Sequence, residues 1–258
     1  MLVSFSTHSS RKKRKGGGLL VLPVTVIEQA AAAVRAAEHT GHSLILLVDA
    51  TQPLLYGLDV FVQTLLALGR SSAVAISVGV QCGPTHVAAE QALTAGAQFI
   101  VPQYQGSEAQ YVSLLSWSAN RAAAQTAEVV VAPGVAHSLE SLFSLLQTVR
   151  LAGVILPEEM LQVGGAFNPA LIHEIASMVK LPLLVALHED KMPSQMVKCI
   201  KAGVSGFLIE NEFDQTFTAG IRTGLRNKTL SDPRTYLAKA SLAVEEKMAR
   251  YLELLCSI

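Results

Sequence analysis

Short apolar runs alternate with longer segments of helical period along this chain, and no other feature limits its fold as much. The runs are too short to be helices, and most are apolar at odd and even positions alike, which is typical of parallel strands buried on both faces. We predict eight strands: Leu19–Val24, Leu44–Asp49, Val74–Gly79, Phe99–Pro102, Val129–Ala132, Gly153–Leu156, Leu183–Leu187 and Gly206–Ile209.

Amphipathic segments between these runs predict the helices that connect the strands. They are Val26–Glu38, Val60–Leu68, Thr85–Ala95, Ser138–Leu151, Pro169–Met178 and Ser194–Ala202. Eight β-then-α units with right-handed crossovers predict a single (β/α)8 TIM barrel over all 258 residues. The alternative is an open Rossmann-type sheet, but no GxGxxG turn follows an early strand. We predict two further helices outside the barrel, within Leu225–Ile258.

Charge and cysteine content argue against several classes of protein. Lys plus Arg and Asp plus Glu both number 20, so net charge favours neither nucleic acid nor a membrane as partner. No apolar run approaches the roughly 18 residues that span a bilayer. The cysteines Cys82, Cys199 and Cys256 lack disulfide-framework spacing, which favours the reducing cytoplasm.

The basic run Arg11–Lys15, within residues 1–18, predicts a solvated helix face, with nucleic acid or anionic lipid as the alternative.

The last third of the chain carries its most specific motifs. Leu181-Pro-Leu-Leu-Val-Ala-Leu-His-Glu-Asp190 and the run Gly203–Arg222 follow the register of IPLVLHGGSG and GVAKVNIDTDLRLAFTAALR. Asp232-Pro-Arg-Thr-Tyr-Leu237 and Val244-Glu-Glu-Lys-Met248 then match DPRKYL and VxxKM. In this order the motifs resemble the end of class II (zinc-dependent) fructose/tagatose bisphosphate aldolases. The resemblance implies a TIM barrel with its chemistry at the carboxyl ends of the strands.

The resemblance also implies a zinc ion on three histidines and a carboxylate that transfers protons. Where the family has HLDHG, this chain has GVQCG, so Gln81 replaces the acid–base aspartate and Cys82 replaces a zinc histidine. Met160 lies near the place of the second zinc histidine, and Ala186 takes the place of the third. We therefore expect no cofactor. The alternative is a zinc ion on Cys82 and on His188, which lies two residues beyond Ala186.

The loops that bind phosphate in the family are changed as well. HGGSG is replaced by Ala186-Leu-His-Glu-Asp190, and NIDTD by Leu208-Ile-Glu-Asn-Glu212. Loop glycines let backbone N–H groups approach an anion, whereas the carboxylates of Glu189 and Asp190 would repel one. The changes thus affect the metal ligands, the proton-transfer group and the phosphate loops together.

Acidic residues gather instead at the predicted carboxyl ends of the strands. They are Asp49, Glu158, Glu159, Glu189, Asp190, Glu210 and Glu212. Such a barrel mouth, with Gln81 beside it, would suit a cation, an amine or a basic segment of a partner rather than a bisphosphate. The alternative is that these are ordinary solvated loop carboxylates.

Two functions from different classes follow. The first is a non-catalytic aldolase-like binding, assembly or regulatory subunit, in a homo-oligomer or in a hetero-oligomer with an aldolase paralogue. The second is an aldolase or lyase of carbohydrate metabolism that uses Cys82, His188 and Glu210, with or without a metal. The second requires Cys82, His188 and a mouth carboxylate to converge, so their geometry discriminates between the two. A role bound to nucleic acid through Arg11–Lys15 is a third possibility, which we do not favour.

Overall fold

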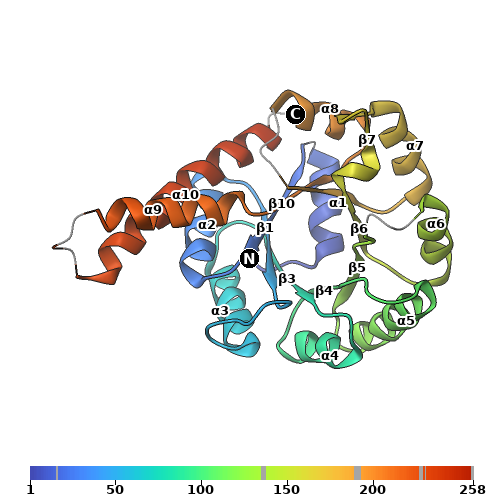
Figure 1. The fold of residues 1–258 in the computed structure, drawn as a ribbon, viewed down its shortest axis with the longest axis horizontal. Helices are drawn as coiled ribbons and strands as arrows, with labels where there is room; N and C mark the ends of the chain where they lie inside the picture. Colours follow the sequence, from blue (N-terminus) through green and yellow to red (C-terminus); the bar gives the residue numbers. More distant parts are fainter. Residues whose placement is uncertain (16, 135–137, 189–192, 227–228, 230, 257–258) are drawn as a thin grey trace.

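A computed structural model of the chain describes residues 1–258 apart from 16, 135–137, 189–192, 227–228, 230 and 257–258. Its parallel strands close into one barrel in the order β1-β10-β9-β6-β5-β4-β3-β2 (Figure 1). The barrel strands are β1 Leu19–Val24, β2 Leu44–Asp49, β3 Ile76–Cys82, β4 Phe99–Pro102, β5 Glu128–Val131, β6 Gly153–Pro157, β9 Leu183–Leu187 and β10 Gly206–Ile209. The predicted TIM barrel is confirmed.

Helices surround the barrel, and several begin at a side-chain cap. They are α1 Phe5–Lys15, α2 Ile27–Thr40, α3 Leu58–Ser71, α4 His86–Thr94, α5 Glu108–Ala124, α6 Leu139–Thr148, α7 Pro169–Val179, α8 Pro193–Ala202, α9 Glu212–Gly224 and α10 Pro233–Cys256. Thr85, Ser107 and Ser138 each accept a hydrogen bond from the N–H three residues on, which fixes where α4, α5 and α6 start. A short 3-10 helix, η1 Glu158–Leu161, and a hairpin, β7 Gln162–Val163 with β8 Ala166–Phe167, follow β6. In the described part of the chain, no helix has the length and apolarity to cross a bilayer.

Strand β3 begins two residues later than predicted and ends three residues later. The start of the chain pairs with it: Ile76 N–H donates to Met1 O at 2.9 Å, and Val3 N–H donates to Ile76 O at 3.0 Å. The strand then continues until Cys82 lies opposite Pro102 of β4. Contacts remote in sequence, which apolar periodicity does not report, set these two limits.

Along each strand, successive residues face alternately the barrel interior and the surrounding helix layer. The interior residues form one cluster: Leu19, Val21, Ile45, Leu47, Phe99, Val101, Val130, Ile155, Leu184, Ala186 and Leu208, together with Phe5 of α1. Gly79 of β3 leaves room for a large ring in this cluster, because a Cβ there would lie 2.2 Å from Phe99 Cζ. The other strand residues, Val78, Val80 and Cys82 among them, pack with the helices in a second, larger cluster.

Helix α1 closes the amino end of the barrel and lies across the ring of strands in Figure 1. Phe5 is fully buried, with its ring centroid 5.1 Å from that of Phe99. His8 Nδ1 lies 2.9 Å from Ser77 Oγ, and Ser6 N–H donates to Glu128 Oε2 at 3.0 Å. The basic run Arg11–Lys15 forms the end of α1, as a helix was predicted there; its side chains lie outside the described residues.

Helices α9 and α10 form an antiparallel pair that extends away from the barrel (Figure 1). Two glycines of α9 let the helices meet closely: a Cβ at Gly220 would lie 2.5 Å from Ala240 Cα, and one at Gly224 would lie 2.6 Å from Tyr236 Cβ. The later half of α10 packs on α2, where Arg35 Nε bonds Glu245 Oε2 at 2.8 Å. The prediction of two helices within Leu225–Ile258 is wrong: the described residues form the single long helix α10, since nothing in Pro233–Cys256 interrupts the helical hydrogen bonds.

Candidate functional site

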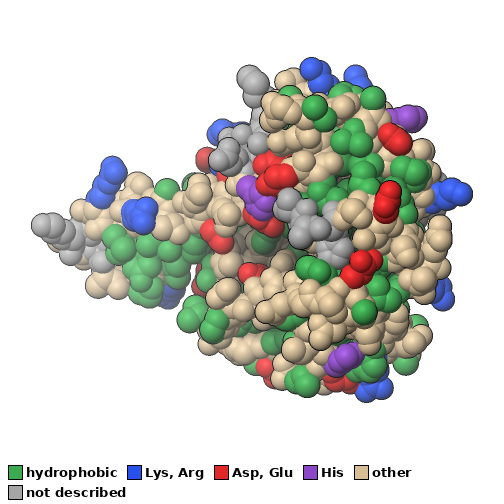
Figure 2. All heavy atoms as spheres, turned by 45° about the vertical axis from the view of Figure 1, so that its right-hand side comes forward, with side chains coloured by type: hydrophobic (Ala, Val, Ile, Leu, Met, Phe, Trp, Pro, Cys, Tyr) green, Lys and Arg blue, Asp and Glu red, His purple; other side chains and the backbone are tan. Residues whose placement is uncertain are grey.

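Three adjacent strands bring an imidazole and two carboxylates together at the barrel mouth, by which we mean the carboxyl ends of the strands and the loops after them. His188 follows β9, Glu210 follows β10 and Glu159 lies in η1 after β6, and β9 lies between the other two strands. His188 Nδ1 is 2.6 Å from Glu210 Oε2, and its Nε2 is 3.6 Å from Glu159 Oε1. We call Glu159, His188 and Glu210 the mouth cluster. Figure 2 shows a histidine among acidic side chains on this face.

The mouth cluster is an acid–base arrangement that is partly open to solvent. The His188 side chain is 44% exposed and that of Glu210 33%. A carboxylate at Nδ1 orients an imidazole ring and selects its tautomer. Because a carboxylate faces each ring nitrogen, protonated His188 can interact with both, whereas the neutral ring donates to only one. The cluster can therefore hold or move a proton at His188.

Two further predicted residues lie side by side on β2 and β3. Asp49 is in register with Gln81. Asp49 Oδ1 accepts hydrogen bonds from Thr51 N–H at 2.9 Å and from Thr51 Oγ1 at 2.5 Å, so this carboxylate shapes the start of its own loop. Gln81 is half-buried and takes the interior-facing phase of β3, with Ser77 and Gly79. An amide thus lies where the resemblance expects a carboxylate.

Cys82 faces away from the mouth, which the alignment could not reveal. It takes the same phase of β3 as Val78 and Val80 and packs in the helix layer, 1% exposed. Burial raises the pKa of the Cys82 thiol to about 12. The same cause raises the pKa of the neighbouring Tyr111 phenol on α5. Period-2 alternation, applied to the end of β3, was the signal that would have placed this thiol.

The other acidic residues predicted at the mouth do not belong to the mouth cluster as the structure describes it. Glu158 is buried at the start of η1. Glu212 is also buried, where its carboxylate pairs with Lys247 and accepts a hydrogen bond from Tyr251 Oη at 2.5 Å, so it joins α9 to α10. Glu189 and Asp190 lie outside the described residues.

The mouth residues that the structure describes do not fit the zinc ion that the resemblance implies. Cys82 points into the helix layer with a high thiol pKa, and Ala186 offers no ligand atom. A carboxylate already lies at each ring nitrogen of His188. Among the residues that the structure describes, no three His, Cys, Asp or Glu side chains are placed to hold a metal ion.

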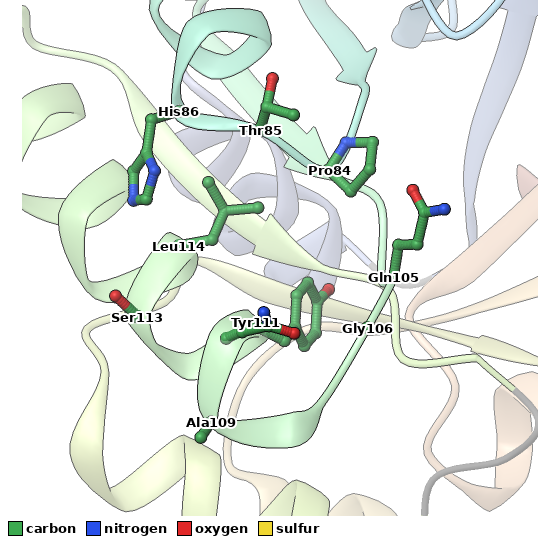
Figure 3. A pocket seen from close by; sticks show the side chains of 10 residues that line it. Pro84, Thr85, His86, Gln105, Gly106, Ala109, Tyr111, Ser113 and Leu114 are labelled. Atoms are coloured by element: carbon green, nitrogen blue, oxygen red, sulfur yellow. The ribbon is translucent and has the colours of Figure 1, made fainter.

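A hollow of about 600 Å³ lies on the other side of the mouth, between the starts of α4 and α5 (Figure 3). Its lining includes Thr85, His86, Gln105, Gln110 and Tyr111. The His86 ring stands edge-on to that of Trp117 on α5, with their centroids 5.0 Å apart. Sequence reasoning did not identify this hollow. The capping residues of α4 and α5 predict two helix starts but not that they lie side by side.

Comparison with solved structures shows that the fold of this chain is similar to the folds of aldolases. The YdjI aldolase from Escherichia coli K12 is similar over 99% of this chain and 97% of its own, with a TM-score of 0.85 and 12% identity. The fructose-bisphosphate aldolase from Campylobacter jejuni has a TM-score of 0.78 and 11% identity over 98% of this chain and 95% of its own. A structure from Coccidioides immitis has a TM-score of 0.83 and 16% identity over 97% and 94%.

The sequence matches no protein-family model and no curated protein. Identities of 11–16% establish the fold and leave the activity open. The chain therefore has an aldolase-like TIM barrel, and its function has to be argued from the mouth.

Proposed function

We propose that this chain is a non-catalytic, aldolase-like binding and assembly subunit whose mouth receives a cationic group. The observation that carries the proposal is the pair of interior-facing positions at the mouth: Gln81 on β3 and Ala186 on β9. The resemblance expects the acid–base carboxylate and a zinc histidine at these two positions.

Neither replacement can perform the chemistry of the residue it replaces. A glutamine amide has no proton to exchange near neutral pH, so Gln81 cannot serve as the general acid or base. A methyl group cannot ligate zinc, and the thiol of Cys82 faces the helices instead. Zinc in such a reaction polarises a carbonyl group, which a metal-free mouth would leave unactivated.

The charge of the mouth supports binding of a cationic group. Glu210 is partly exposed after β10, in the segment that takes the place of a phosphate-binding loop, and Glu159 is partly exposed in η1 after β6. Two carboxylates at this distance from one imidazole attract an ammonium or guanidinium group and repel a bisphosphate. This part of the proposal concerns the ligand class and is separate from the loss of catalysis.

The test is a joint measurement of zinc and aldol cleavage. The purified chain is incubated with zinc, dialysed extensively and analysed for metal, and its cleavage of fructose and tagatose 1,6-bisphosphate is followed through the triose products. We expect neither retained zinc nor cleavage. The matched control is Gln81→Asp combined with Ala186→His, which returns two expected groups to the interior face. Stoichiometric zinc with cleavage by the unmodified chain would overturn the proposal.

A second candidate is an enzyme with reworked chemistry, a lyase acting on a small carbonyl compound. The 2.6 Å contact between His188 and Glu210 favours it, because an imidazole oriented by a carboxylate is a competent general base. The test is exchange of the α-protons of dihydroxyacetone with D2O, followed by NMR. Exchange that the chain catalyses and that His188→Gln abolishes would favour this candidate. Exchange equal to the protein-free rate would exclude it for this substrate.

A further inference from the structure

The hollow between the starts of α4 and α5, here called the α4–α5 hollow, lies apart from the mouth cluster. Residues after β3 and β4 form it, whereas the mouth cluster follows β6, β9 and β10. Its volume of about 600 Å³ lies within the roughly 300–1,000 Å³ typical of small-molecule sites. Figure 3 shows His86 and Leu114 on one side of it and Gln105 on the other. The barrel therefore has room for a ligand at a second place.

The floor of the α4–α5 hollow is apolar and fixed by packing. Tyr111 and Leu114 of α5 line it and are only 1% and 4% exposed. Tyr111 Oη donates a hydrogen bond to Pro102 O at 3.1 Å, and the Tyr104 ring stands edge-on to the Tyr111 ring with their centroids 5.1 Å apart. Side chains that are already held in place do not have to be ordered when a ligand binds, so the entropic cost of binding is lower.

The rim of the hollow carries polar side chains that share one property: each both donates and accepts hydrogen bonds. They are the hydroxyl groups of Thr85 and Ser113, the amides of Gln105 and Gln110 and the imidazole of His86. A hydroxyl group, an amide and a neutral imidazole each hold a donor and an acceptor, whereas carboxylates only accept and Lys and Arg only donate. The described residues that line the hollow include no Lys, Arg, Asp or Glu.

Much of this hydrogen-bonding capacity is available to a ligand. The side chains of His86, Gln105 and Ser113 make no hydrogen bond to another described residue. Gln110 Oε1 accepts a hydrogen bond from Ser107 N–H at 2.9 Å, which leaves the NH2 group of that amide to donate. The rim thus offers neutral groups of both hydrogen-bonding senses above an apolar floor.

We propose that the α4–α5 hollow is a binding site for an uncharged sugar, that is, one without a phosphate group. A sugar hydroxyl is itself both donor and acceptor, so it pairs with rim groups of the same kind in either sense. The C–H face of the sugar ring packs on the apolar floor, in the way that ligand sites combine an apolar wall with a few polar groups. The proposal goes beyond the proposed function and does not depend on the charge of the mouth cluster.

A charged ligand fits the same lining less well. A phosphate group would meet no Lys or Arg among the described lining residues, and an ammonium group would meet no Asp or Glu. Either charge would lose water without gaining a counter-charge, which is unfavourable. The lining therefore favours an uncharged ligand over a charged one of similar shape.

Trp117 provides a local readout for the test. It is the only tryptophan of the sequence, and its ring lies edge-on to that of His86 with their centroids 5.0 Å apart. The full chain is titrated with the methyl α-pyranosides of glucose, galactose and mannose, each to about 100 mM, while Trp117 fluorescence is recorded. We expect at least one of them to give a saturable change with a Kd on the order of 1–10 mM, since hydroxyl groups lose water on binding. Glucose 6-phosphate should bind no more tightly than methyl glucoside.

The decisive variant is Gln105→Glu, which keeps the shape of the side chain but makes it an acceptor only. We expect the Kd of the best sugar to rise at least about tenfold, because a hydroxyl that accepts from the amide loses its donor. His86→Ala should also weaken binding, and saturation-transfer NMR measures this without relying on the surroundings of Trp117.

The matched control is His173→Ala, which removes an exposed imidazole of α7 and should leave the Kd unchanged. Thermal unfolding of each variant shows that it is folded. The inference is overturned if none of the three sugars binds at about 100 mM. It is also overturned if glucose 6-phosphate binds about tenfold more tightly than methyl glucoside, or if neither Gln105→Glu nor His86→Ala changes the Kd. The zinc and cleavage measurements concern the mouth alone, so failure of one proposal can be distinguished from failure of the other.

Discussion

The two ends of the barrel are built differently. At the amino end, α1 places the fully buried Phe5 against Phe99. Ser77 Oγ is hydrogen-bonded to His8 Nδ1, and Glu128 accepts a hydrogen bond from Ser6 N–H. At the carboxyl end, His188, Glu159 and Glu210 are partly exposed and meet one another on short loops. A buried aromatic contact stabilises the fold by several kcal/mol, whereas exposed ion pairs contribute little. The amino end thus carries stability, and the mouth is free to vary in chemistry.

This comparison predicts that truncating Phe5 causes the largest loss of stability. Phe5→Ala should lower the free energy of unfolding by about 3–5 kcal/mol, because it removes a buried ring and leaves a cavity in the barrel interior. Urea denaturation measures the change. Leu55→Ala is the control at the other end: this side chain is 80% exposed on the loop between β2 and α3, and its truncation should change stability by less than about 0.5 kcal/mol. Equal losses of stability from Phe5→Ala and Leu55→Ala would show that the two ends of the barrel do not differ in this way.

Overpacking the interior should have the next largest effect. Gly79→Ala would place a Cβ 2.2 Å from Phe99 Cζ, so the ring must move, at a cost of about 1–3 kcal/mol. Phe99→Leu in the same chain should recover part of that loss by making space. A double variant no more stable than Gly79→Ala alone would show that the strain lies elsewhere. Both values come from denaturant titrations.

The pH dependence of stability tests whether the Cys82 thiol is buried in the helix layer or exposed at the mouth. Burial raises its pKa in the native chain from the ordinary 9.0 to about 12, so above pH 9 the unfolded chain releases a proton that the native chain keeps. The contribution is fully present below pH 9 and is lost as pH rises towards 12, by about 1.4 kcal/mol per pH unit. Cys82→Ala should reduce this slope. An unchanged slope, or rapid alkylation of the native thiol at pH 8, would place Cys82 in an exposed site.

The smallest effect is expected at the mouth cluster itself. Glu159→Gln should change the free energy of unfolding by less than about 0.5 kcal/mol, because its ion pair with His188 is long and half-exposed. Glu212→Gln is the matched control: it breaks the buried pair with Lys247 and should cost clearly more. If both substitutions cost the same, the mouth also carries stability and the comparison between the two ends fails.

The local pattern of apolar residues was enough to predict an element wherever the residues of that element alone set its limits. Six of the eight predicted strands begin at the residue found in the structure, because a buried parallel strand is apolar throughout and ends at a turn. The limits of β3 and the number of C-terminal helices were wrong. The first depends on pairing with the chain start, and the second on a helix whose interior has no breaker.

The sequence by itself determined the barrel and which residue types follow its strands, since periodicity and the residue at each position are local properties. Only the tertiary structure decided which groups meet. It turned Cys82 into the helix layer and brought His188 between Glu159 and Glu210. It also paired Glu212 with Lys247 and Tyr251 of α10. The physical reason is that strands adjacent in a closed barrel are distant in sequence, so the contacts between their loops depend on closure of the ring.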